Sequence, residues 1–336
     1  MEKVSVRKPT EAPDQDIEAG LPSSISVNSG VATAQALREA KAAKSSSLWS
    51  DARRRFLRNK LAIAGLIIML LIVIPVVGAE VFQRYDPNVS NYDRSPGAPK
   101  LFDQNYQAPS AAHWFGTDGQ NRDLWARMLH GGRSSLLVGI VVQFIVLGVG
   151  LPVGMIIGFF GGKIDTAGSF IVNIFYAFPS ILAGLLLLSA FGGNIFWVCL
   201  AIGIGLWAPM ARLVRGQVLS LREKEFVEAS RAIGVKPGLI MFRHILPNIL
   251  GPIIVSVSFG IPQAIQIEAF YGFIGVSVPP PATSWGQLVK DGYDAFQSNP
   301  VTILIFPALA IALTCMSLNF IGDGMRDGLD PKTKNG

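Results

Sequence analysis

Six apolar runs, each long enough to cross a bilayer as a helix, limit what this chain can fold into. A helix needs about 20 apolar residues to span the hydrocarbon core of a membrane. The runs are Leu61–Ala79, Leu136–Phe160, Gly168–Phe191, Ile195–Ala211, Ile249–Ile267 and Val301–Ile321. Half of the 336 residues are hydrophobic and only 15% are charged, which leaves no room for a large soluble domain. The sequence therefore predicts an all-α membrane protein with six transmembrane helices.

Basic residues beside these runs predict that both chain termini are cytoplasmic. Arg53, Arg54, Arg55, Arg58 and Lys60 crowd the start of the first run. The loop 213–247 carries six Lys and Arg residues and falls on the same side. The loop 80–134, placed outside, disagrees because it also carries six, together with six acidic residues. The N-terminal cluster is denser, so we expect a multi-pass membrane protein with this orientation.

A polar segment between the fourth and fifth runs predicts a cytoplasmic helical hairpin over 221–247. Ser220 and Glu223 have the spacing of a capping box, which places the start of a helix at Leu221. Gly234 is suited to end that helix in a left-handed conformation, and Pro237 discourages its continuation. The apolar face of the first helix is predicted to be Phe226, Ala229 and Ile233, and a second short helix is predicted over Leu239–Ile245.

Small residues predict close helix packing elsewhere. Gly150, Gly154 and Gly158 lie four residues apart in the second run, where another helix can approach closely.

The hairpin resembles the EAA loop of ABC-importer permeases through Glu228-Ala229, Gly234 and Ile245-Leu246-Pro247-Asn248. Three further segments resemble the C-type dipeptide and oligopeptide permeases, and the resemblance covers roughly residues 50–332. These segments are His113-Trp114-Phe115-Gly116-Thr117-Asp118 with Arg122-Asp123; Glu268-Ala269, Phe273-Ile274-Gly275, Pro280-Pro281 and Ser284-Trp285-Gly286; and Asn319-Phe320-Ile321-Gly322-Asp323-Gly324-Met325-Arg326-Asp327 with Leu329-Asp330-Pro331. The chain departs from the family pattern at Asn121, Tyr271, Gly272 and Ser277, positions that bear on partner fit and cargo.

The resemblance implies a type I ABC importer permease fold with a cytoplasmic coupling-helix loop, 213–247. It implies a homologous B-type permease subunit as partner, two ATPase subunits, an external substrate-binding protein and contact with membrane lipid, but no nucleic acid. ATP and Mg would be bound by the ATPase subunits, so this chain would hold no cofactor or metal and would have no catalytic residue. The implied ATPase-docking residues are Glu228, Ala229, Ser230, Ile233, Gly234, Lys236 and Pro237.

The implied activity is import of dipeptides or oligopeptides by alternating access, with this chain forming half of the path. The same family also includes importers of nickel, glutathione and oligosaccharides. The implied organisation is a disordered cytoplasmic tail (1–50), the first span with an external loop (51–129), a five-helix core (130–330) and a C-terminal tail (331–336). The first span would pack around the sister subunit.

Glu268 is the one carboxylate at or inside the edge of a predicted span. It lies 20 residues beyond Asn248, about 30 Å along a helix, and therefore near the external face. A charge at mid-bilayer costs about 3 kcal/mol or more, so Glu268 should face a partner or an aqueous path. Two interpretations remain open: a pathway or gate residue, or a structural group that bonds a sister subunit or the free amides where Gly272 and Gly275 break the helix.

Other function classes fit the sequence less well. A secondary transporter predicts ionisable residues near mid-membrane and internal repeats, and a membrane-embedded enzyme predicts clustered His, Asp or Ser within the spans. The spans are nearly bare of both, and no nucleotide-binding glycine loop occurs. A passive scaffold would not need so many proline-interrupted spans. A basic loop on the membrane surface or a DNA-binding helix-turn-helix are the alternatives for the hairpin, and the bilayer on both sides disfavours the second.

Overall fold

The computed structural model describes residues 48–95, 100, 104–295 and 301–329, and almost all of its regular structure is helical. The helices are α2 (Leu48–Phe56), α3 (Lys60–Val77), α4 (Ala79–Phe82), α5 (Leu124–Phe160), α6 (Gly162–Ala177), α7 (Ser180–Phe191), α8 (Ile195–Arg222), α9 (Glu225–Ala232), α10 (Pro237–Ile240), the π-helix η2 (Met241–Ile245), α11 (Leu246–Ile274), α12 (Trp285–Asp294) and α13 (Thr302–Leu329). Among the described residues the only β pairing is an isolated bridge between Thr117 and Asp123.

Five helical segments are long and apolar enough to cross a membrane singly: α3, α5, α8, the continuous α10–η2–α11, and α13. The predicted third span, 168–191, is instead a pair of helices, α6 and α7, bent by 78°. Pro179 explains the bend, because a proline disfavours helical backbone at the residue before it, and Phe178 is extended at ψ 133°. The predicted all-α membrane fold is confirmed, with its third span broken.

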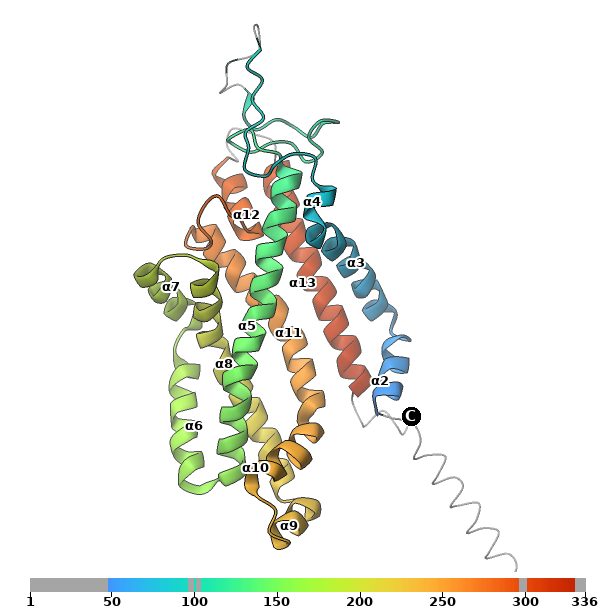
Figure 1. Cartoon of the computed structure of the whole chain (residues 1–336), viewed down its shortest axis with the longest axis vertical. Coiled ribbons are helices and arrows are strands. Elements are labelled where there is room, and N and C mark those ends of the chain that lie inside the picture. The colour runs from blue at the N-terminus through green and yellow to red at the C-terminus, as the bar shows by residue number, and fades with distance from the viewer. Residues whose placement is uncertain (1–47, 96–99, 101–103, 296–300, 330–336) are drawn as a thin grey trace, which may run out of the picture. The chain divides into compact units, whose positions relative to one another are not determined.

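Helices α5 and α8 pack side by side along much of their length (Figure 1). A Cβ on Gly150 would lie 2.8 Å from the Trp207 carbonyl oxygen, and one on Gly154 would lie 2.5 Å from that of Ala211. A Cβ on Gly158 would lie 2.9 Å from Val218 Cβ. Because only glycine allows this approach, the predicted small-residue contact is confirmed. The main hydrophobic core lies between these helices and α11.

The first span packs on its own chain. Gly65 of α3 faces the Ser317 carbonyl of α13, where a Cβ would meet the oxygen at 2.7 Å. The Asn59 amide, which caps α3, also donates to Asp327 Oδ2 at 3.1 Å. The resemblance implied packing around a sister subunit, and the buried side of α3 does not have that role. The opposite side, with Ile67 and Leu71, is exposed and free to meet lipid or a partner.

The bundle has two distinct ends (Figure 1). The hairpin end carries α9 and α10, and the loop end carries α12 and the irregular segment 104–123. The predicted boundary between residues 129 and 130 falls inside α5, so the segment predicted as an external loop and the predicted five-helix core share this helix. Residues 48–50 belong to α2, which corrects the predicted disordered stretch 1–50 at its C-terminal edge. The rest of that stretch and the tail 331–336 lie outside the described residues.

Candidate functional site

The first arm of the hairpin is α9, and it begins later than the capping box predicted. Helix α8 continues through Ser220 to Arg222, Glu223 lies at its C-terminal end, and α9 starts at Glu225 without a side-chain cap. The extension of α8 follows its buried face, because Val214 and Val218 are fully buried in the core. Burial of that face decided where the helix ends, and the local capping pattern did not.

Helix α9 presents its apolar face, formed by Phe226, Ala229 and Ile233, to the outside. Val227 is fully buried, and Ser230 is buried with its hydroxyl donating to the Phe226 carbonyl at 2.7 Å. Phe226 and Ile233 are 41% and 81% exposed, and Ala229 is exposed as well. The residue spacing is helical as expected, and the structure adds that this apolar face does not meet the core, which spacing alone does not reveal.

The turn after α9 closes as the sequence predicted. Gly234 has φ +79°, in the left-handed region that favours glycine. Its N–H donates to the Arg231 carbonyl at 3.0 Å, and the Val235 N–H donates to the Ser230 carbonyl at 3.1 Å. This pair of bonds is a Schellman motif, which satisfies two carbonyls at the helix end. The chain therefore reverses in a defined geometry.

The second arm is continuous with a membrane-spanning helix. It begins at Pro237, where a proline at the first helical position needs no amide donor, and runs through η2 into α11. The separate helix predicted over Leu239–Ile245 is therefore wrong: the wider π turn precedes Pro247, and the helix continues to Ile274. The second arm of the hairpin is thus the first part of the helical segment Pro237–Ile274.

The predicted docking residues gather at the hairpin, with one exception. Glu228, Ala229, Ile233, Gly234, Lys236 and Pro237 are exposed there. Ser230 is buried, and its hydroxyl donates to the Phe226 carbonyl within the same helix, so it is not presented to a partner. Two large apolar side chains that were not among the predicted docking residues are exposed beside them: Leu239 and Phe242. The sequence shows both as bulky apolar residues in a hairpin rich in polar ones, a pattern that could have indicated a contact surface.

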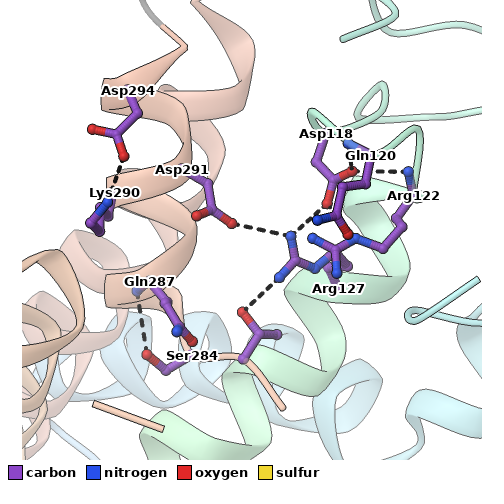
Figure 2. A network of polar contacts seen from close by, with 10 residues as sticks. Asp118, Gln120, Arg122, Arg127, Ser284, Gln287, Lys290, Asp291 and Asp294 are labelled. Atoms are coloured by element: carbon purple, nitrogen blue, oxygen red, sulfur yellow. Dashed lines mark hydrogen bonds and ion pairs between the residues drawn. The ribbon is translucent and has the colours of Figure 1, made fainter. Parts of the chain in front are cut away.

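At the loop end, an ion-pair network joins the irregular segment to α5 and α12 (Figure 2). Asp118 Oδ2 lies 2.5 Å from Arg127 Nη1 and 2.8 Å from Arg122 Nε. The same Arg127 nitrogen lies 3.2 Å from Asp291 Oδ2 of α12, and its Nη2 donates to Thr283 Oγ1 at 3.3 Å. Asp118 and Arg127 are both buried. The Arg127 guanidinium thus links α5 to the irregular segment, to α12 and to the residue Thr283 that precedes α12.

The rest of the first loop-end motif folds this segment onto the start of α5. Asp123 caps α5 by accepting from the Ala126 N–H at 2.8 Å, and its other oxygen lies 2.8 Å from His113 Nδ1. Asn121, which departs from the family glycine, has φ +54°. Asparagine is among the few residues that tolerate this conformation, so the departure keeps the backbone geometry.

Glu268 is enclosed by its own subunit. Its side chain is fully buried, and its two oxygens accept hydrogen bonds from Ser135 Oγ at 2.9 Å and Ser277 Oγ at 3.0 Å. Ser135 Oγ also accepts from the Trp285 N–H at 3.2 Å. Within this chain Glu268 therefore lies in the interior and not at the surface. It joins α5, α11 and the chain beyond Gly275, and it bonds hydroxyls rather than the free amides considered from the sequence.

Comparison with known proteins identifies the family. Residues 150–335 match the model of the binding-protein-dependent transport system inner membrane component, and residues 47–109 match the N-terminal TM domain of oligopeptide transport permease C. The chain belongs to this family of ABC-importer permeases. The resemblance stated from the sequence motifs is thereby confirmed, and a secondary transporter is ruled out.

Several relatives of this permease match nearly their whole length. The oligopeptide transport system permease protein OppC of Haemophilus influenzae is 43% identical over 288 residues, 86% of this chain and 90% of the relative. That of Bacillus subtilis is 40% identical, over 87% and 92%. The glutathione transport system permease protein GsiD of Pectobacterium atrosepticum is 34% identical, over 85% and 92%.

A solved structure, an inward-facing conformation of the MetNI methionine ABC transporter, matches this permease with a TM-score of 0.50 and 22% identity. The match covers 60% of this chain and 96% of the other. It supports the fold of the permease core and carries no information on cargo.

The loop end of this permease is charged at neutral pH. A hydrogen bond from Arg133 holds the pKa of Glu80 at about 2. The hydrogen bond to Asp294 raises the pKa of Lys290, and the two groups lie 2.5 Å apart. Burial, followed by the nearby Asp118 carboxylate, raises the pKa of Tyr106. Each group keeps its usual charge near pH 7, so this end presents a stable polar surface.

Proposed function

We propose that this permease is one of two membrane subunits of an ATP-driven importer of dipeptides or oligopeptides, located in the bacterial or archaeal inner membrane. Relatives named oligopeptide and dipeptide transport permeases support this cargo at about 40% identity over most of the chain. The basic residues at the start of α3 lie at the hairpin end, which supports a cytoplasmic hairpin and cytoplasmic termini. A glutathione permease among the relatives keeps that tripeptide as a cargo to test.

The observation that carries the proposal is the exposed hairpin, continuous with α11. A short helix resists bending better than a loop does, because its backbone hydrogen bonds hold its shape. Ile233 and Phe226 supply apolar contact, and Glu228 can accept a charge-assisted hydrogen bond from a basic group on an ATPase subunit. When ATP closes the ATPase subunits, the docked hairpin moves and α11 moves with it. ATP affects the permease only through this difference in contacts between two conformations.

The remaining partners follow from the two ends. Two ATPase subunits, which bind ATP and Mg, dock at the hairpin end of this chain and of a homologous B-type permease. An external substrate-binding protein delivers peptide to the loop end, where the ion-pair network holds a rigid platform. The exposed apolar side of α3 meets lipid or the sister permease.

Docking is tested by co-purifying the chain with its ATPase subunits. Ile233→Asp and Glu228→Arg are expected to reduce the retained ATPase by about tenfold or more, because a central contact residue commonly contributes about 2 kcal/mol or more. The matched control is Val81→Asp in α4 at the loop end, since Val81 is 83% exposed and Ile233 81%. The docking assignment fails if Ile233→Asp retains as much ATPase as Val81→Asp does.

Cargo is tested separately with the complete complex in proteoliposomes. Uptake of a labelled tripeptide should require ATP and the binding protein, and an excess of unlabelled peptide should compete. Uptake of nickel or of an oligosaccharide in place of peptide would contradict the peptide assignment while leaving the docking result intact.

A further inference from the structure

A cleft on the side of the bundle runs from the hairpin end toward mid-helix. Its wide part, about 790 Å³, lies between α8, α11 and α13 and is lined by Gln217, Ser256, Gln263 and Arg326, among others. It continues into a notch of about 60 Å³ that Ser256, Gly260 and Gln263 also line, and that Gln143 of α5 closes. The cleft therefore narrows from its wide part to the notch, and Gln143 lines its narrow end.

Gln143 is an unsatisfied polar group at the narrow end of this cleft. Its side chain is 5% exposed, and its Nε2 has no hydrogen-bond partner within the described chain. A buried donor left without a partner costs about 1–3 kcal/mol, so such groups normally have one. Gly260 leaves room for this amide, since a Cβ there would lie 2.5 Å from Gln143 Oε1. Gly260 therefore makes room for the Gln143 side chain, while the Nε2 group stays available for a hydrogen bond to a ligand.

Gln143 lies near the middle of its membrane-spanning helix, far from both helix ends. Gln143 lies 19 residues from the start of α5 and 17 from its end, about 28 Å and 26 Å along the helix. Its neighbours on α5, Ile140 and Phe144, are exposed and apolar. Polar side chains at such depth face a partner or an aqueous path rather than lipid. Gln263 is exposed on α11 at the mouth of the same notch.

The chemistry of the notch selects a ligand class. A glutamine amide and a serine hydroxyl each donate and accept, and neither carries charge. Among the residues that the structure describes, no carboxylate or imidazole group, which a cation would need, lines the notch, and the basic Arg326 lines only its wide mouth. A peptide group, with one N–H and one carbonyl, is complementary to a carboxamide in both directions.

We propose that Gln143, Gln263 and Ser256 form a subsite that pairs with backbone amides of the peptide during its passage. This inference rests on the proposed peptide cargo. Recognition of the backbone does not depend on side chains, so one subsite serves peptides of many sequences. The wide mouth releases the peptide at the hairpin end, where the cleft opens.

The test compares Gln143→Leu and Gln263→Leu in the complete complex, with Gln266→Leu as the matched control. Gln266 is exposed on the same helix as Gln263 but does not line the cleft. We expect the two cleft variants to lower ATP-dependent peptide uptake about fivefold to tenfold, the effect of one lost hydrogen bond, while Gln266→Leu imports normally. A benzophenone-labelled peptide should crosslink to α5 and α11 in the wild type and less so in both cleft variants.

The outcomes are distinguishable. If the wild type imports no peptide, the proposed cargo fails before the subsite is tested. If it imports peptide and both cleft variants match Gln266→Leu in uptake and crosslinking, the subsite is overturned. Loss of the sister permease from purified Gln143→Leu complex would also overturn it, because Gln143 would then be a subunit contact. Gln263 is exposed, so Gln263→Leu does not disturb the packed core, and a loss of uptake in this variant does not reflect misfolding.

Discussion

At the scale of single residues, the polar groups of this permease act through partners far away in sequence. Glu268 was placed correctly near one end of its span, but its bonds to Ser135 and Ser277 reach another helix and a loop. Nothing in the local sequence distinguishes such a carboxylate from one that lines a pathway. The departure at Asn121 shows the converse, because its left-handed φ is a local property that asparagine itself permits.

Glu268 is expected to be structural, and two substitutions separate this role from a pathway role. Glu268→Leu leaves two buried hydroxyls without their acceptor and should lower the free energy of unfolding by about 1–3 kcal/mol. Glu268→Gln keeps an oxygen and a donor for those hydroxyls and should be close to wild type. Thermal unfolding of the purified chain in detergent measures both, with Glu225→Leu at an exposed position as control. A stable Glu268→Leu that fails only in peptide uptake would favour the pathway interpretation.

At the scale of elements, helix ends were decided by burial where the helix packs and by glycine and proline where it does not. Helix α8 extends past a capping box because its apolar face stays buried, whereas α9 ends at Gly234 as its sequence indicates. Pro179 breaks the third span, yet Pro237 starts the arm that leads into the fifth. The same residue type has opposite effects because one lies inside an apolar run and the other at a helix start.

The turn of the hairpin should depend on the left-handed conformation of Gly234 and not on space around it. A Cβ on Gly234 meets nothing within 4 Å, so Gly234→Ala should destabilise the turn through its φ of +79° alone, by about 1 kcal/mol. Gly238→Ala is the control, since its Cβ is equally unobstructed and its φ lies outside the left-handed region. Hydrogen exchange of the α9 amides should speed up in the first variant only. Equal exchange in both would show that the turn has another origin.

At the scale of the whole molecule, tertiary contacts bring segments that are distant in sequence together at each end of the bundle. At the loop end, segments 113–123 and 283–291 are joined by Arg127, which pairs with Asp118 and Asp291. At the other end, the hairpin is exposed while its arms merge into α8 and α11. The arrangement suits a subunit that receives cargo at one end and is driven at the other.

Arg127 should therefore hold the loop end together. Arg127→Met removes the ion pair with buried Asp118 and should lower the free energy of unfolding by about 2 kcal/mol, because the carboxylate loses one charge-assisted hydrogen bond and keeps the one to Arg122. Lys290→Met is the control: the Lys290–Asp294 pair lies on an exposed helix surface and should contribute less than about 1 kcal/mol. Thermal unfolding and limited proteolysis of segment 104–123 measure the effect. If both variants unfold alike, Arg127 does not clamp this end.

The sequence by itself determined the properties that are local or additive along the chain. Apolar run lengths specify the membrane spans, glycine spacing specifies the α5–α8 contact, and Gly234 specifies the hairpin turn. Only the tertiary structure decided which side of α9 is buried, that Ser230 faces inward, that α3 packs on α13, and that Glu268 is enclosed. The physical reason is that a periodic pattern defines a face without naming its partner. Which face is buried depends on contacts between residues far apart in the chain.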